Sequence, residues 1–390
     1  MTTPIRNQHP LMDYRRFGKT GRMLSVITLG GMRYLHGWDA PRDQIPADMR
    51  EQCARMVTLA FDAGINHIET AHGYGKSEVC YGQVLNDDLK IPRNRYHLMT
   101  KGAPQTASEA RRLVEEQLKA LKTDRIDLYG WHGINNADIC RVALAKGGPV
   151  EELHKMAREG IIGDVGFSTH APLDVICEAI GSGLFSFVNL HFYYFLQRNA
   201  AAVALAAARD MGVFIISPND KGGQLFNPSP ALRQLTAPLT PIQWNARWCL
   251  RTPHVQTLSF GLTEPSHVAE MLGVCPATTP LSARDVAITA RMDARTALDP
   301  VGAYEGWELL NDPSGINIPE VLRYRRMWQC WDQESFGRYR YNMFEAKGHW
   351  FPGTYATDDA IAKLDRAKWP AGIDVAALLR EAHQRFHRAK

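Results

Sequence analysis

The sequence contains few of the features that mark secreted, membrane-spanning or metal-binding proteins. Its seven cysteines are scattered along 390 residues, and no Cys-x-x-Cys pair occurs. This pattern is typical of reduced thiols and argues against a disulfide framework or a zinc site. No run of about 18 apolar residues is present, and the first residues lack the apolar core of a signal peptide. We therefore expect a cytoplasmic protein without a membrane segment.

Long blocks of charge are also absent. The chain has 45 basic and 41 acidic residues, with a formal net charge of +4. A small, evenly distributed charge does not predict a nucleic-acid partner. The basic and aromatic run Arg325–Tyr341 is more typical of an amphipathic helix that packs its rings on a neighbour. A hydrophobic content of 45% is that of an ordinary globular protein.

Several signature motifs are missing as well. The segment Leu29–Tyr34, which follows the first predicted strand, has no G-x-G-x-x-G, and G-x-x-x-x-G-K-[ST] occurs nowhere. A doubly wound nucleotide-binding fold is therefore the weaker structural alternative. The absence of H-E-x-x-H and His-x-His argues in the same way against a metal-dependent barrel hydrolase. We expect no metal ligands.

The chain instead shows a repeated alternation of short apolar strands and helical segments. Strands are expected near 26–31, 67–71, 96–101, 126–132, 164–169, 185–192, 213–217 and 255–261. Helices are expected at 47–63, 77–85, 108–121, 150–158, 173–180, 199–211, 241–250 and 266–272. Eight such units in roughly 250 residues predict a (β/α)8 TIM barrel over residues 13–275. Residues 276–390 are expected to form a mostly helical C-terminal extension.

The stretch from Gly64 to Glu78 is the most informative part of the chain. A predicted strand presents Glu69 at its end, and the glycine-flanked loop that follows presents Tyr74. An acid and a phenol five residues apart are typical of a proton-transfer site, although an ordinary loop with a surface tyrosine would have the same sequence. The next two predicted strands end near Lys101 and His132. Because barrel chemistry lies at the carboxyl ends of strands, these four side chains should meet.

These residue types suit the reduction of a carbonyl group. A lysine ammonium near a tyrosine should lower the phenol's pKa, and a carboxylate would keep the lysine charged and oriented. A histidine could donate a hydrogen bond to the substrate oxygen. Glu69, Tyr74, Lys101 and His132 together would protonate an oxygen that gains negative charge, whereas the hydride must come from a cofactor. For His72, His170 and His191, we expect hydrogen-bonded loop positions.

The region 13–275 resembles the aldo-keto reductases. The resemblance begins at Tyr14–Gly21 and is most specific in Gly73-Tyr74-Gly75-x-Ser77-Glu78. The family's catalytic Tyr, Lys and His fall on Tyr74, Lys101 and His132, while its Asp is replaced by Glu69, one methylene longer.

The resemblance also implies a nicotinamide cofactor, with NADP(H) favoured over NAD(H). The positions that it assigns to cofactor binding are Gly31, Met32, Ser168, Thr169, Asn189, Ser217, Gly261, His267 and Glu270. Three departures from the family pattern are Leu190 at a usual glutamine, Ile216 at a usual aromatic residue and His267 where an arginine often binds the 2′-phosphate.

The extension resembles that of a branch with a C-terminal ferredoxin-like module, on the segments 315–321, 338–341 and 348–353. Iron–sulfur clusters in proteins are commonly held by four thiolates, and the extension has only Cys330, so we expect no cluster. Large apolar side chains would then hold a metal-free helical appendage together. They are Trp307, Trp328, Trp331, Phe336, Tyr339, Tyr341, Phe344, Trp350, Phe351 and Trp369.

The sequence thus predicts an NAD(P)H-dependent oxidoreductase that reduces a small aldehyde or ketone, or runs the reverse reaction. The alternative is a nicotinamide-binding sensor or regulatory subunit with little turnover. Leu190 and Ile216 favour this alternative, whereas Tyr74, Lys101 and His132 oppose it.

Overall fold

A computed structural model of the chain describes residues 4–34, 41–302, 304–344 and 352–388. The chain forms two compact units. Unit 1 comprises Met1–His191, Asn199–Pro218 and Cys249–Pro280, and unit 2 comprises Phe192–Arg198, Asn219–Trp248 and Leu281–Lys390. We describe each unit by itself.

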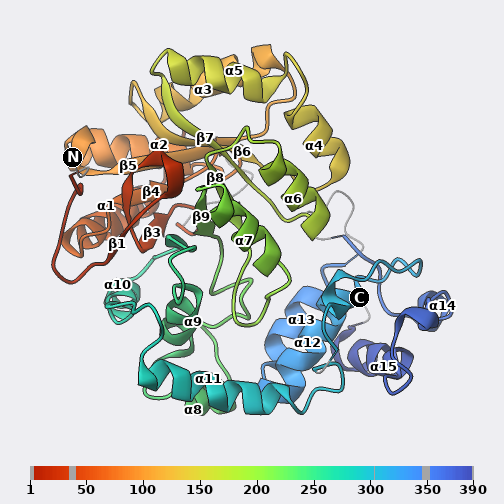
Figure 1. Cartoon of the computed structure of the whole chain (residues 1–390). Coiled ribbons are helices and arrows are strands. Elements are labelled where there is room, and N and C mark those ends of the chain that lie inside the picture. Colours follow the sequence, from red (N-terminus) through yellow and green to blue (C-terminus); the bar gives the residue numbers. More distant parts are fainter. Residues whose placement is uncertain (1–3, 35–40, 303, 345–351, 389–390) are drawn as a thin grey trace. The chain divides into compact units, whose positions relative to one another are not determined.

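Unit 1 contains a closed barrel of eight parallel strands (Figure 1). The strands are β3 (Ile27–Gly30), β4 (His67–Glu69), β5 (His97–Gly102), β6 (Ile126–His132), β7 (Ile162–Ser168), β8 (Phe187–Leu190), β9 (Gly212–Ile215) and β10 (Thr257–Phe260). Neighbours in sequence are neighbours in the barrel, and β10 closes it by pairing Leu258 with Ile27 of β3. The prediction of a (β/α)8 barrel is therefore confirmed.

Helices follow the strands and cover the outside of the barrel (Figure 1). Those of unit 1 are α1 (Ala47–Asp62), α2 (Ser77–Gln83), α3 (Ala107–Ala120), α4 (Ala137–Ala143), α5 (Pro149–Arg158), α6 (Leu173–Gly181), α7 (Ala200–Ala208) and α10 (Pro265–Leu272). Helix α4 was not predicted, and α2 continues as one π-helical turn, Val84–Asp88, beyond its predicted end. The Thr106 hydroxyl caps α3 by accepting from Glu109 N at 3.2 Å. The Glu109 carboxylate accepts from Gln105 N, one residue before the N-cap.

A short antiparallel hairpin, β1 (Tyr14–Arg16) and β2 (Met23–Ser25), packs on the amino ends of the strands. Its Phe17 and Leu24 join a fully buried cluster with Met99, Leu128, Phe187 and Phe214 from the barrel. A Cβ on Gly212 would lie 2.6 Å from the Phe17 ring, so only glycine fits there. The hairpin therefore forms the floor of the barrel.

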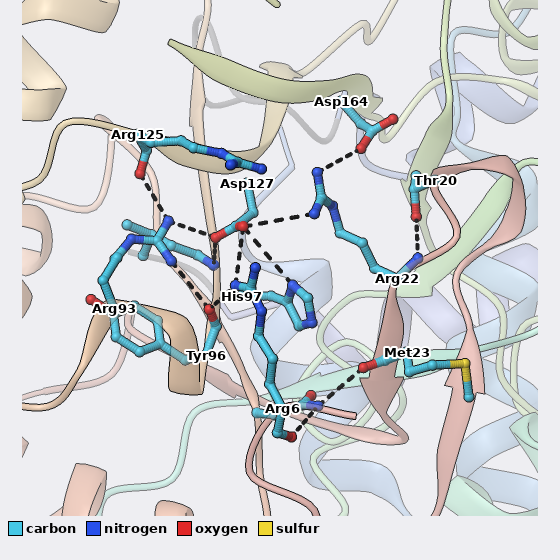
Figure 2. A network of polar contacts seen from close by, with 12 residues as sticks. Arg6, Thr20, Arg22, Met23, Arg93, Tyr96, His97, Arg125, Asp127 and Asp164 are labelled. Atoms are coloured by element: carbon cyan, nitrogen blue, oxygen red, sulfur yellow. Dashed lines mark hydrogen bonds and ion pairs between the residues drawn. The ribbon is translucent and has the colours of Figure 1, made fainter. Parts of the chain in front are cut away.

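A network of ion pairs surrounds Asp127 at the same amino end (Figure 2). Its carboxylate accepts from Arg93 Nη2 at 2.6 Å, from Arg6 Nη1 at 3.2 Å and from Leu98 N at 2.9 Å. Arg22 Nη1 lies 3.7 Å away. Burial by itself would raise the pKa of Asp127, but Arg93, the Leu98 amide and the other nearby positive groups lower it to about 2.

Two histidines are buried side by side near this network. His67 and His97 are paired in register on β4 and β5. Thr28 Oγ1 lies 2.8 Å from His67 Nδ1. Burial disfavours the imidazolium form and lowers the pKa of His67 to about 3 and that of His97 to about 2. Both rings are therefore neutral in the folded protein at ordinary pH.

Unit 2 is helical in the part that the structure describes. Its helices are α8 (Pro230–Thr236), α9 (Pro241–Cys249, all but its last residue), α11 (Ala283–Thr296), α12 (Ile318–Trp331), α13 (Glu334–Tyr341), α14 (Asp358–Ile361) and α15 (Val375–Phe386). Helices α11, α12, α13, α14 and α15 lie in the C-terminal region that was expected to be mostly helical. The predicted domain boundary between residues 275 and 276 stays a prediction. Unit 2 also contains residues 192–198 and 219–248, which precede that boundary.

Aromatic side chains supply much of the packing in unit 2. Ring centroids lie 4.7 Å apart for Tyr194–Trp244 and 5.0 Å apart for Phe195–Trp331. Of the aromatic residues that were predicted to pack, Tyr339 is instead 49% exposed. Trp350 and Phe351 lie outside the described residues, as does most of the predicted segment 348–353. No helix in the described part of the chain is long and apolar enough to cross a membrane.

Candidate active site

Two oppositely charged side chains meet inside the carboxyl end of the barrel. Alternation along a strand places Lys101 on the same face of β5 as the core residue Met99. Lys101 Nζ contacts Glu69 Oε1 and donates to Thr70 O at 2.9 Å. Both charged side chains are almost fully buried, so each depends on the other for a counter-charge.

The loop after β4 places Tyr74 against this pair. Tyr74 Oη donates to Glu69 Oε1 at 3.3 Å, and Lys101 Nζ lies 4.8 Å from the centre of the phenol ring. Gly75 has φ +55°, a left-handed conformation that favours glycine and lets the chain turn into α2. The phenol and the ammonium therefore share one carboxylate.

His132 completes the group of four from the end of β6. Its ring meets the Tyr74 ring edge-to-face, with centroids 5.7 Å apart and planes at 85°. A Cβ on Gly73 would lie 3.6 Å from the imidazole, so the loop also passes close to this ring. The structure thus brings together all four side chains that the sequence suggested.

The electrostatics of the site differ from the expectation in one respect. Desolvation raises the pKa of Tyr74, although the positive charge of Arg33 acts in the opposite direction. The expectation that Lys101 would lower this pKa was therefore wrong. Tyr74 directs its hydroxyl at a carboxylate, which stabilises the phenol and not the phenolate. Burial also lowers the pKa of Lys101 well below its ordinary value, while the adjacent Glu69 carboxylate favours the ammonium.

Ser259, on β10, is a site residue that sequence reasoning missed. Its hydroxyl donates to Glu69 Oε2 at 3.2 Å, so both carboxylate oxygens have partners. A Cβ on the neighbouring Gly30 would lie 2.7 Å from Ser259 Oγ and 3.4 Å from Glu69 Oε2. Glycine at this position leaves room for the Ser259 hydroxyl. The position of Ser259 near the end of a predicted strand was the signal that could have identified it.

Three of the predicted cofactor positions lie together at the ends of β7 and β8. Ser168 Oγ accepts from Gly133 N at 3.1 Å, and Thr169 Oγ1 donates to Ile134 O at 2.6 Å. Asn189, paired in register with Ser168, is buried and has its Nδ2 3.3 Å from Met99 Sδ. Its Oδ1 has no hydrogen-bond partner among the described residues. An unpaired amide oxygen beside hydroxyl groups fits a ligand that carries a carboxamide.

Of the four other predicted cofactor positions in the strand-end loops, the two glycines have steric explanations of their own. A Cβ on Gly31 would lie 2.3 Å from Ser77 Oγ, so this glycine allows α2 to pack closely. Gly261 lies against the side chain of Arg33. Ser217 has φ +51° just after β9, and Met32 is 37% exposed.

His267 and Glu270 lie on α10. His267 Nδ1 accepts from Thr263 N at 3.2 Å and from Glu264 N at 3.3 Å, and the Glu264 side chain accepts from the backbone N–H of His267. This reciprocal arrangement is a capping box. The imidazole at the expected 2′-phosphate position therefore also caps its own helix. Glu270 is half-buried.

The remaining strand-end histidines have hydrogen-bonding partners, as expected. His72 Nε2 contacts Arg42, and His170 Nδ1 lies 2.5 Å from His191 Nε2 with the rings stacked. No group of three or more His, Cys, Asp or Glu side chains within the described ranges could hold a metal ion.

The fold and the cluster define a barrel protein with its polar site at the carboxyl ends of the strands, the usual place for barrel chemistry. A model of the aldo/keto reductase family matches residues 26–223, half of the chain. The chain therefore belongs to the aldo/keto reductase family, whose members that resemble it are oxidoreductases.

Two named relatives match parts of the chain. It is 33% identical over 134 residues to a 6-dehydroglucose reductase of Novosphingobium aromaticivorans, which covers 30% of this chain and 41% of that enzyme. It is 28% identical over 161 residues to a D-arabinose 1-dehydrogenase of Saccharomyces cerevisiae, which covers 39% of this chain and 45% of that enzyme. These matches span less than half of each relative.

Solved structures share the fold. An aldo-keto reductase from Klebsiella pneumoniae in complex with NADPH has a TM-score of 0.57 and 21% identity, over 72% of this chain and 95% of that one. A Bacillus halodurans aldo-keto reductase in its holo form has a TM-score of 0.58 and 20% identity, over 72% and 96%. At these identities the likeness concerns the fold alone.

Proposed function

We propose that this protein is a nicotinamide-dependent oxidoreductase that interconverts a carbonyl group and an alcohol, with Tyr74 as the proton donor and acceptor. The observation that carries the proposal is the buried contact of Lys101 and Tyr74 with one carboxylate, Glu69, at the mouth of the barrel. A phenol held beside an ammonium can transfer a proton to an oxygen that gains charge.

Each side chain of the cluster has a distinct task. Tyr74 gives its proton to the carbonyl oxygen in reduction and takes it from the alcohol in oxidation. Lys101 supplies positive charge near the phenol ring, and Glu69 fixes the direction of that ammonium. His132, edge-on to Tyr74, would hold the substrate oxygen by a hydrogen bond. The bound nicotinamide would supply or accept the hydride.

Ser168, Thr169 and Asn189 are the residues that would hold the nicotinamide carboxamide. The unpaired Asn189 Oδ1 supports this assignment because an amide N–H is its natural complement. We keep NADP(H) as the favoured cofactor on the family resemblance, and the related fold from Klebsiella pneumoniae was solved with NADPH. His267 would contact the 2′-phosphate through Nε2, since Nδ1 is an acceptor in the cap.

Carbohydrates are the substrate class that we propose to test first. The two named relatives are a 6-dehydroglucose reductase and a D-arabinose 1-dehydrogenase. A sugar offers both a carbonyl group for reduction and a hydroxyl group for oxidation at the same site.

The test is a panel of aldoses, keto-sugars and simple aldehydes, assayed in both directions with all four nicotinamide cofactors. We expect turnover of at least one pair and stereospecific transfer of deuterium from labelled reduced cofactor to product carbon. Tight cofactor binding without turnover on any substrate would contradict the proposal and favour a nicotinamide-binding sensor, which Leu190 and Ile216 also favour.

A further inference from the structure

Glu78, the second residue of α2, is a carboxylate with no exposed surface. Its Oε1 accepts from Thr100 Oγ1 at 2.5 Å and from Gln117 Nε2 at 2.6 Å. Thr100 precedes Lys101 on β5, and Gln117 lies on α3. A buried carboxylate is retained only where such bonds offset its loss of water.

The second oxygen of Glu78 reaches toward the Tyr74 loop. Glu78 Oε2 accepts from Arg42 Nη2 at 2.9 Å, and Arg42 Nε donates to Gly75 O at 3.2 Å. The same guanidinium contacts His72 Nε2. Arg42 therefore binds the loop on both sides of Tyr74 and is itself held by Glu78.

The other branch of the network reaches the main chain of Lys101. Gln117 Nε2 also donates to Lys101 O at 3.1 Å, and His72 N donates to the same carbonyl oxygen at 2.8 Å. Tyr129 Oη donates to Gln117 Oε1 at 2.9 Å, which fixes the orientation of the amide. One carboxylate thus connects the backbone around Tyr74 with the backbone of Lys101.

The hydrogen bond from His72 N to Lys101 O joins the loop to β5 directly, two residues before Tyr74. Tyr74 makes only short-range backbone bonds, from its N to Ala71 O at 3.0 Å and from Ser77 N to its own O at 3.1 Å. These turn bonds do not themselves reach β5, so beyond His72 the position of the loop depends on side-chain contacts. Arg42, which donates to Gly75 O, and the buried Glu78 carboxylate that binds Arg42 supply such a contact on the other side of Tyr74.

The geometry points to Glu78 as a positioning residue that, together with Arg42, holds Tyr74 in register with Lys101 and Glu69. It touches neither the proposed substrate nor the proposed cofactor. Its kinetic consequence rests on the proposed function, whereas the anchoring of the loop does not.

Glu78→Gln is the direct test, because it keeps the shape of the side chain and removes its charge. A misplacement of about 1 Å can cost 10²-fold in rate, so we expect kcat to fall about 10- to 100-fold with KM and cofactor Kd within about twofold. Hydrogen exchange of the amides in 71–78 should also become faster. Asp88→Asn, which breaks a surface pair with Arg50, is the matched control and should change none of these quantities.

Arg42→Met tests the same connection from its exposed end, where the fold is less at risk. Burial raises the pKa of Glu78, while Thr100, Gln117 and Arg42 oppose this. Removing Arg42 should therefore shift the acidic limb of the kcat profile to higher pH, and Arg42→Lys should partly restore it. Unchanged kcat and unchanged exchange in 71–78 in both variants would overturn the inference, even if they melted earlier. If the wild type fails to turn over any substrate, the proposed function is wrong. The hydrogen-exchange comparison still shows whether Glu78 and Arg42 anchor the loop.

Discussion

The two ends of the barrel in unit 1 each bury a carboxylate, but the groups that bind the two carboxylates differ. At the mouth one carboxylate, Glu69, serves Lys101, Tyr74 and Ser259. At the floor one carboxylate, Asp127, is surrounded by three guanidinium groups and a backbone amide (Figure 2).

The difference shows how one scaffold separates reactivity from stability. The floor holds its carboxylate in the charged form, with a pKa of about 2, so no proton is exchanged there near neutral pH. At the mouth burial disfavours the charged forms of Tyr74 and Lys101, so the phenol keeps the proton that the proposed reaction would transfer. Chemistry is expected at the carboxyl end of a barrel and stability at the amino end.

The largest effect should come from Tyr74→Phe at the mouth. Loss of the proton donor should lower kcat by about 10²- to 10⁴-fold. Cofactor affinity and the unfolding midpoint should stay close to wild type, because the phenol's hydroxyl is not part of the core. Steady-state kinetics and fluorescence titration would check this. Near-normal turnover would show that another group moves the proton.

Asp127→Asn at the floor should have the opposite effect, lowering stability and leaving kcat unchanged. Three arginines would lose their shared counter-charge, so we expect a loss of about 3–5 kcal/mol in the free energy of unfolding and an unchanged kcat at low temperature. Asp210→Asn, which removes the exposed partner of Arg16, should cost less than about 1 kcal/mol. Denaturant unfolding of both variants provides the comparison, and equal losses would contradict it.

The floor should also make the fold sensitive to acid. His67 and His97 have folded pKa values of about 3 and about 2, below the ordinary 6.5, so the unfolded chain binds more protons between these limits. Their contribution to stability is complete above about pH 6.5 and is lost as the pH falls, by about 1.4 kcal/mol per unit for each ring. Asp127 adds to this loss below about pH 4, since its folded pKa is about 2.

Thermal unfolding measured at pH values from 7.5 to 4 should reveal this loss of stability with falling pH. His97→Gln, which cannot titrate, should make this loss smaller. A flat profile for the wild type would mean that these rings are not buried as neutral groups.

The smallest effect should come from His267, at the position expected to bind the 2′-phosphate of the cofactor. His267→Arg places a permanent charge at α10, and we expect the affinity ratio of NADPH to NADH to rise about five- to tenfold. His267→Gln keeps an acceptor for the cap without charge and should leave the ratio near wild type. Fluorescence titration of both reduced cofactors would measure this. A parallel change for the two cofactors would indicate that only the cap was altered.

The sequence was informative wherever periodicity decides the structure. Each of the eight barrel strands begins or ends within two residues of its predicted bounds, because each is a short apolar run bounded by turns. The meeting of Glu69, Tyr74, Lys101 and His132 could also be predicted, since parallel strands in a barrel end on one side. Their catalytic roles stay predictions.

Long-range contacts could not be read in the same way. The partners of Asp127 are Arg6, Arg22 and Arg93, and no local pattern connects arginines so far from it in the chain. The direction predicted for the Tyr74 pKa was wrong because burial raises this pKa, and sequence spacing does not specify burial. The helix α4 has only 7 residues, too few for a clear helical periodicity.

Because β10 pairs with β3, the barrel cannot close during synthesis until β10 has been made. Leu258 pairs with Ile27, and Phe17 packs under Gly212, so these contacts form only after residues roughly 200 positions later have been made. Until then β3 has an unpaired edge, and the hairpin lacks the later strands that it packs against. An unpaired edge strand invites pairing with another chain. Slow, late ring closure should therefore make the nascent protein depend on chaperones, and truncation before residue 260 should leave an aggregating product rather than a smaller working enzyme.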